Sequence, residues 1–157
     1  VLTTMLASMQ GGRWLHWTHH WRVKGTSSFA DHELFEMLYD SWTGEIDDLA
    51  EKIVGMFGPS SIDPHSLLAV SSEHIDRFKD IGCLHKTSLA VEEDLQVTIR
   101  TIYDILKSMQ ALSLGMDDFL MSMANKHERF VYLLQQRIAD DGGRAGIEKP
   151  PYDFSLV

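Results

Sequence analysis

The longest helical pattern in this chain runs without interruption from about residue 28 to residue 56. Apolar residues recur in it at steps of three and four, as in an amphipathic helix that buries one stripe. These residues are Leu34, Phe35, Leu38, Trp42, Ile46, Leu49, Ile53 and Val54. Gly58 and Pro59 end the pattern, and none of the four prolines falls inside a periodic segment. A helix of this length predicts a long helical bundle.

Three further long helices are predicted from the same periodicity, over 3–24, 88–112 and 117–140. Gly11 and Gly12 are expected to weaken the first of them, and Gly115 to break the chain before the last. The connection between the second and third long helices is long, and it contains a short helix near 72–79. The residues expected to point inward from the last two helices are Leu95, Ile99, Ile102, Leu106, Met109, Phe119, Leu120, Met123, Phe130, Leu133, Leu134 and Ile138.

The sequence therefore predicts an all-α four-helix bundle over residues 1–140, followed by an irregular tail over 141–157. At 157 residues and 44% hydrophobic content, the chain has material for one well-formed core. No apolar run approaches the roughly 18 residues that span a bilayer. The single cysteine, Cys83, fits a reducing compartment, so a cytoplasmic protein is expected. A net charge of −9 argues against a general nucleic-acid surface.

Four residues carry metal-ligand chemistry: His20, His32, Asp47 and Glu51. Imidazole and carboxylate together suit iron, manganese or zinc, and Asp47 and Glu51 share one helix face. His32 and Asp47, however, lie on the same predicted helix, with their backbones about 22 Å apart at 1.5 Å per residue. A single chain therefore cannot place His32 and Asp47 on the same metal ion. Either the four residues are unrelated, or a site is assembled between two chains related by a two-fold axis.

The remaining histidines and the clustered tryptophans give less specific indications of a role. His16 lies one turn before His20 and is expected to pack or to support the site, whereas His19 is expected to be interfacial or exposed. No role is assigned to His65, His74, His85 and His127. Core and interface positions are expected for Trp14, Trp17 and Trp21, and the methionines are expected to fill gaps in the core.

Residues 15–56 resemble the Dps family, the mini-ferritins or DNA-binding proteins from starved cells. The matching residues are His20-Trp21, Val23-Lys24-Gly25, Phe29, His32, Asp47 and Ala50-Glu51-Lys52. The later part is similar more loosely, through Gly115-Met116-Asp117-Asp118, His127-Glu128 and Tyr132-Leu133-Leu134. The resemblance covers about residues 1–140 and leaves the tail outside it.

This resemblance implies a ferritin-like bundle whose chains assemble into a hollow shell of twelve. It implies a ferroxidase site at each two-fold interface, where Fe(II) is oxidised by hydrogen peroxide or dioxygen and a ferric mineral is stored. On this basis His20 and His32 come from one subunit and Asp47 and Glu51 from its partner, with zinc able to take the place of iron. The expected role is protection against oxidative damage.

Two departures from the family pattern qualify this expectation. The lysine-rich terminal extension with which many members bind DNA has no counterpart before Lys24, and twelve chains of −9 would carry about −108. Direct DNA binding is therefore not expected. Ser113 replaces an acidic residue of the family's iron-entry pore, although Asp117 and Asp118 remain. Two alternatives stay open: a metal-binding shell that does not mineralise, and a DNA-compacting protein.

Overall fold

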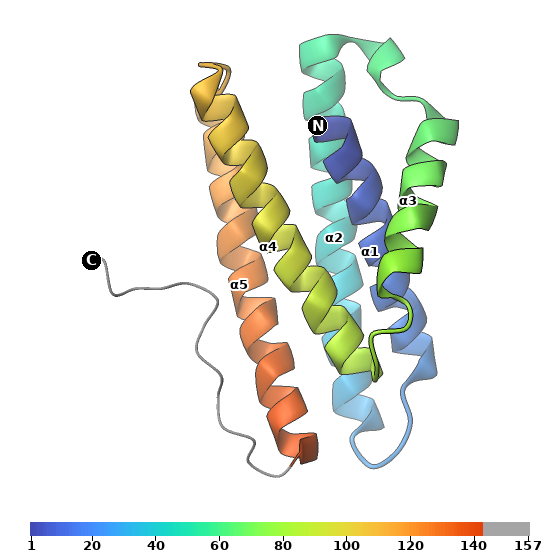
Figure 1. Ribbon diagram of the computed structural model, residues 1–157. Helices are drawn as coiled ribbons and strands as arrows, with labels where there is room; N and C mark the ends of the chain where they lie inside the picture. Colours follow the sequence, from blue (N-terminus) through green and yellow to red (C-terminus); the bar gives the residue numbers. More distant parts are fainter. Residues whose placement is uncertain (143–157) are drawn as a thin grey trace, which may run out of the picture.

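The computed structural model describes residues 1–142, which form five α-helices and one short 3-10 helix and contain no strand (Figure 1). In chain order these are α1 (Leu2–Arg22), α2 (Ser28–Phe57), η1 (Pro59–Ser61), α3 (Pro64–Phe78), α4 (Leu84–Ser108) and α5 (Leu114–Gly142). The all-α prediction is confirmed. The predicted tail over 141–157 lies outside the described residues, apart from the last two residues of α5.

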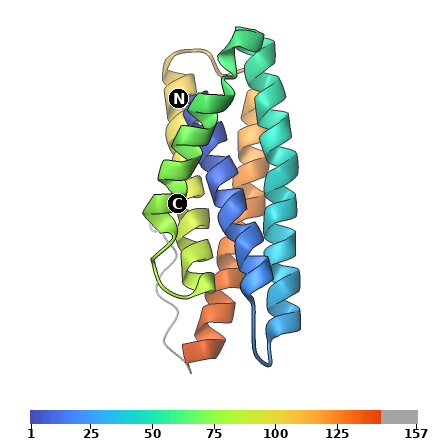
Figure 2. The ribbon, with the colours of Figure 1, turned by 90° about the vertical axis from the view of Figure 1, so that its right-hand side faces the viewer.

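Four long helices, α1, α2, α4 and α5, form the bundle, and α3 packs on the outer side of α1 (Figures 1 and 2). Among the four long helices, the closest pairs are α1 with α2 and α4 with α5, which are consecutive helices joined by short turns. The extra helix lies between the second and third long helices, as predicted. Within the part of the chain that is described, no helix is long and apolar enough to cross a membrane.

The prediction for α3 was wrong about where this helix begins. The helix starts at Pro64, eight residues before the predicted position, and spans 15 residues. Asp63 caps it, because its Oδ2 accepts a hydrogen bond from the Ser66 backbone N–H at 2.8 Å. Pro64 occupies the first turn, where a missing N–H has no cost. This Asp-Pro pair is a helix-start signal that the apolar periodicity alone did not reveal.

The boundary between α4 and α5 also differs from the prediction. The α4 helix runs from Leu84 to Ser108, about one turn earlier than expected at both ends. Gly115 does not break the chain but lies in the first turn of α5, where the Met116 N–H donates to the Ser113 hydroxyl at 3.2 Å. The break falls instead at Gln110, whose φ of 56° is incompatible with a continuing helix.

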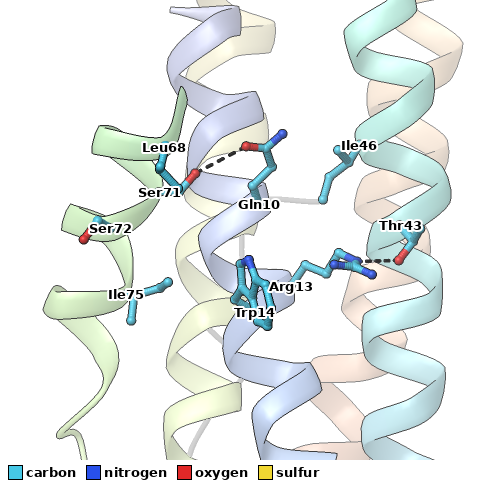
Figure 3. A pocket seen from close by; sticks show the side chains of 9 residues that line it. All are labelled: Gln10, Arg13, Trp14, Thr43, Ile46, Leu68, Ser71, Ser72 and Ile75. Atoms are coloured by element: carbon cyan, nitrogen blue, oxygen red, sulfur yellow. Dashed lines mark hydrogen bonds between the residues drawn. The ribbon is translucent and has the colours of Figure 1, made fainter. Parts of the chain in front are cut away.

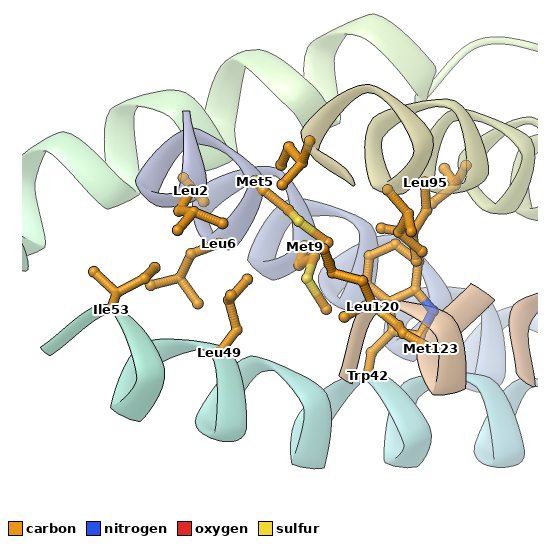
Figure 4. Packing of buried hydrophobic residues seen from close by; sticks show 14 of the residues in the cluster. Leu2, Met5, Leu6, Met9, Trp42, Leu49, Ile53, Leu95, Leu120 and Met123 are labelled. Atoms are coloured by element: carbon orange, nitrogen blue, oxygen red, sulfur yellow. The ribbon is translucent and has the colours of Figure 1, made fainter. Parts of the chain in front are cut away.

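The core lies between the four long helices, and Figure 4 shows side chains from α1, α2, α4 and α5 meeting there. Most of the predicted inward residues are buried or partly buried, but Met109 is 68% exposed because α4 ends before it. Four methionines fill the core as expected: Met5, Met9, Met116 and Met123. The other four are exposed, namely Met37, Met56, Met109 and Met121.

Gly11 and Gly12 let α1 approach its neighbours closely, which was not anticipated from their low helix propensity. A Cβ on Gly11 would lie 2.7 Å from the backbone oxygen of Ser71 in α3. A Cβ on Gly12 would overlap the ring of Trp42 in α2. The two glycines therefore set the spacing of α1 from α3 on one side and from α2 on the other.

We expect Gly12→Ala to lower the free energy of unfolding by about 1–2 kcal/mol, because overpacking against Trp42 outweighs the gain in helix propensity. Gly55→Ala is the matched control, since a Cβ there meets nothing within 4 Å, and it should be neutral or stabilising. Urea unfolding of both variants measures the difference. Equal effects of the two substitutions would show that the close contact at Gly12 has no energetic weight.

Candidate metal site

His20 and His32 lie together where α1 ends and α2 begins. The five-residue turn between the helices contains Gly25 at a φ of 92°, a conformation that glycine adopts without strain. The turn brings the two imidazole rings into a stack, with centroids 3.5 Å apart and planes 29° apart. His20 is 8% exposed and His32 is exposed, so the pair opens to the surface.

The hydrogen bonds of these two rings fix their tautomers and orientations. The Nδ1 of each ring lies 3.0 Å from the backbone carbonyl oxygen of the other residue. A carbonyl oxygen can only accept, so each Nδ1 carries the hydrogen. The lone pair of each neutral ring is then on Nε2, and both rings are held in fixed orientations. Metal-binding histidines are ordinarily held by such a bond from their other nitrogen.

Asp47 and Glu51 lie far from this pair. Both are exposed on α2, which is continuous from Ser28 to Phe57, so the separation of about 22 Å between the His32 and Asp47 backbones holds. Among residues 1–142, no group of three or more His, Cys, Asp or Glu side chains could hold a metal ion. The structure therefore brings the two histidines together and leaves the two carboxylates apart from them.

An aromatic surface extends along α1 from the histidine pair. Trp14, Trp17 and Trp21 contact one another in series, with ring centroids 5.3 and 5.1 Å apart. Tyr39 of α2 contacts both Trp17 and His20. Trp14 is 44% exposed and Trp21 is 58% exposed, so a core position is wrong for these two, and an interface position stays a prediction.

Beside this surface a groove runs between α1, α2 and α3 (Figure 3). Its apolar walls come from Trp14, Ile46, Leu68 and Ile75, and Leu68 is 68% exposed. Arg13 crosses from α1 to α2, where its Nε donates to the Thr43 hydroxyl at 2.6 Å. An exposed apolar surface of this kind is typical of a protein–protein contact.

A buried polar network, missed from sequence, lies in the core and involves all four long helices. Glu92 of α4 is fully buried and receives a hydrogen bond from Trp42 Nε1 of α2 at 2.8 Å. His16 Nε2 of α1 lies 3.0 Å from the same carboxylate. His127 of α5 donates from Nδ1 to Glu92 at 2.5 Å and from Nε2 to Glu45 of α2 at 2.7 Å.

The charges of this network support one another. Burial alone would raise the pKa of Glu92, but the charge and hydrogen bond of His127, with His16, lower it to about 2. Burial would likewise lower the pKa of His127, but Glu92 and Glu45 raise it to about 9. His127 is therefore an imidazolium between two carboxylates at neutral pH. Such a buried charge group is stable only because each member has its partners.

The network extends toward the histidine pair through Ser88 of α4. The Ser88 hydroxyl lies 2.9 Å from His16 Nδ1 and 2.8 Å from His19 Nδ1. The expectation that His19 is exposed or interfacial was wrong, because it is 2% exposed, and burial lowers its pKa to about 3. His16 is fully buried in the core, so the expectation that it packs is confirmed, and a supporting role at the metal site stays a prediction.

Two histidines that received no role from sequence have carboxylate partners in the fold. His127 contacts Glu45 and Glu92, and His85 lies 3.1 Å from Asp31, which also accepts hydrogen bonds from Arg137. Glu45 lies between Trp42 and Leu49 on a buried, mainly apolar stretch of α2, and that position was a sequence signal that it has a partner. The buried face of α4 around Glu92 also carries Ser88 and Gln96, so it gave no such signal.

The arrangement of α1, α2, α4 and α5, with α3 packed outside α1, is that of a ferritin-like four-helix bundle. No family model matches the chain. Over 92% of its length and 94% of the other chain, it superimposes on the X-ray structure of Dps from Thermosynechococcus elongatus, with a TM-score of 0.70 and 20% identity.

Two curated relatives match part of the sequence. A DNA protection during starvation protein of Brevibacillus brevis is 37% identical over 78 residues, covering 46% of this chain and 49% of the relative. General stress protein 20U of Bacillus subtilis (strain 168) is 48% identical over 40 residues, covering 26% of this chain and 28% of the relative. The matches thus span about half of one relative and a quarter of the other. The resemblance to the Dps family is confirmed.

We expect the stability of the protein to fall at alkaline pH because of His127. Its pKa is raised from 6.5 to about 9 in the folded chain, so its contribution is complete below pH 6.5 and is lost as the pH rises through 9. The free energy of unfolding should fall by about 2 kcal/mol between pH 7 and pH 10. Urea unfolding at the two pH values measures this loss.

His127→Gln should be less stable at pH 7 and should lose little more at pH 10. The matched control is His65→Gln, an exposed histidine of α3, which should keep the pH dependence of the parent chain. If the free energy of unfolding of His127→Gln fell as much between pH 7 and pH 10 as that of the parent chain, the buried imidazolium would not be the source of the fall.

Proposed function

We propose that this chain is the subunit of a hollow homo-oligomeric shell, a dodecamer in the cytoplasm, that oxidises Fe(II) and stores the ferric product. The oxidant is hydrogen peroxide or dioxygen, and the result is protection against oxidative damage. His20 and His32 of one chain, with Asp47 and Glu51 of a second, are the proposed ferroxidase ligands.

One observation carries this proposal: the chain holds a pair of histidines and a pair of carboxylates that are too far apart to bind the same ion within one subunit. The histidine pair is oriented by reciprocal hydrogen bonds and open to the surface. Asp47 and Glu51 are exposed one turn apart on the same helix, about 22 Å along α2. A second copy placed antiparallel to the first along α2 by a two-fold axis would put its carboxylates beside the histidines of the first.

The surface around the two halves supports a second copy as the partner. Trp14 and Trp21 are exposed on α1, and the groove of Figure 3 lies beside them, between the histidines and the carboxylates along α1 and α2. A two-fold contact pairs the same surface with itself, so one apolar surface serves both chains. The partner would then cover these aromatic side chains.

The donor set suits Fe(II) as a substrate. Carboxylates bind both Fe(II) and Fe(III) and offset the charge gained on oxidation, while imidazoles bind without adding charge. Two Fe(II) ions supply the two electrons that one hydrogen peroxide needs, with two protons, to become two molecules of water. Peroxide is thus consumed without releasing a hydroxyl radical, which is the chemistry that a protective protein requires. In this proposal Asp47 and Glu51 would supply the carboxylate donors to the two ions.

The shared site is tested by mixing two inactive variants. His20→Ala/His32→Ala and Asp47→Ala/Glu51→Ala should each lose Fe(II) oxidation and keep the fold. In shells co-assembled from equal amounts, half of the two-fold pairs are mixed and each has one intact site, so about a quarter of the original activity should return. Absorbance of the ferric product and iron retained per shell measure it.

Shells shown by mass spectrometry to contain both variants, yet inactive, would overturn the shared site. Activity in either variant alone would overturn its ligand assignment. Intact oxidation with about two irons retained per site would argue for a binding shell without mineral storage.

We further expect this protein to protect DNA without binding it. A net charge of −9 per chain opposes association with a polyanion, whereas removal of Fe(II) and peroxide prevents radical formation in solution. Plasmid nicking by Fe(II) and peroxide should be suppressed at salt concentrations where a gel shows no DNA shift. Asp47→Ala/Glu51→Ala should remove that protection while the shell remains assembled. Protection by this variant, or a DNA shift at physiological salt, would favour physical shielding instead.

A further inference from the structure

The contact between α3 and α1 contains one buried titratable group, His74. Four residues of α3 are buried: Leu67, Ser71, His74 and Phe78. They face α1, which is the main neighbour of α3, while the contact with α4 is much smaller. His74 is 6% exposed and packs against the Phe78 ring, with centroids 4.8 Å apart.

The two helices are closely packed at this contact. A Cβ on Gly11 of α1 would lie 2.7 Å from the Ser71 backbone oxygen and 3.1 Å from His74 Cβ. The Ser71 hydroxyl also lies 2.8 Å from the backbone oxygen of Ala7 and 2.7 Å from that of Leu67. The backbones of α1 and α3 are therefore in close contact beside His74, and a shift of either helix would disturb this contact.

The hydrogen bonds of His74 fix where its proton lies. Arg77 Nη2 lies 3.4 Å from His74 Nδ1, and a guanidinium can only donate, so Nδ1 accepts. The neutral ring therefore carries its hydrogen on Nε2. That atom is buried and has no hydrogen-bond partner. His74 is thus buried at the cost of one unsatisfied polar group.

A second proton on the His74 ring would strongly destabilise its buried position. It would have to enter at Nδ1, directly opposite the Arg77 cation, and would abolish the hydrogen bond there. The other ionisable groups around the ring are His16 on α1 and Asp94 on α4, and Asp94 is engaged by Arg77 at 2.6 Å. Burial, Arg77 and His16 together lower the pKa of His74 from 6.5 to about 4.

We propose that His74 is an acid-sensitive latch, whose protonation releases α3 from α1 while the four long helices remain packed. Release moves the ring into water, where the cation is solvated and the distance from Arg77 can grow. Because α3 forms one wall of the groove in Figure 3, its release also removes that wall. The latch depends on contacts within one chain and needs neither iron nor the shared site.

The direction and size of the effect follow from the two states of the ring. Docked His74 resists protonation, so docking is at full strength above pH 6.5 and weakens as the pH falls toward 4. For each pH unit between 6.5 and 4, the ratio of released to docked α3 changes about tenfold. The released form should therefore become roughly one hundredfold more populated between pH 7 and pH 4.

Hydrogen exchange of the full chain tests the latch. Protection factors, corrected for the intrinsic rate at each pH, should fall for the amides of residues 68–78 between pH 7 and pH 4, while those in the centres of α2 and α4 hold. His74→Phe keeps a ring against Phe78 but cannot take up a proton, so α3 should stay protected. The matched control is His65→Phe, an exposed histidine of the same helix, which should open like the parent chain.

If His74→Phe does not fold, His74→Gln serves in its place. Equal loss of α3 protection in the parent chain and in the non-titrating variant would overturn the proposal. The proposal would also be overturned if α3 of the parent chain stayed as protected from hydrogen exchange as α2 at pH 4.

Discussion

The fully buried carboxylate of Glu92 is the interaction on which the rest of this bundle depends. An isolated charge in that position would be unstable, so α1, α2 and α5 must each deliver a partner: His16, Trp42 and His127. Apolar packing alone tolerates some sliding of one helix along another. These short polar contacts allow little, and they fix the register of all four long helices.

This register is transmitted to the surface through α4. Ser88 lies one helical turn before Glu92 and contacts both His16 and His19. His19 immediately precedes His20, so the end of α1 that carries the paired histidine is held against the polar core. The orientation of the surface imidazoles thus rests on two sets of bonds: those between His20 and His32, and those behind them in the core.

Most features that depend on a single helix were predictable, although the local Asp63-Pro64 signal at the start of α3 was missed. Features that depend on neighbouring helices were not predictable. The stripe of α2 and the long distance between His32 and Asp47 follow from helical geometry alone. The partner of His127 could not be predicted, because Glu45 and Glu92 come from other helices. Gly12 was misjudged for the same reason: its helix propensity is local, but its neighbour Trp42 is not. The shared metal site itself remains a prediction.

The length of α2 affects when iron oxidation can begin. If the two halves of the site must come from different chains, a newly made subunit has no means of oxidising iron on its own. Chemistry then begins only once two copies have met and the two pairs of residues lie side by side. Helix length would thereby prevent ferric hydroxide from forming in the open cell on single chains, where it would precipitate and trap them.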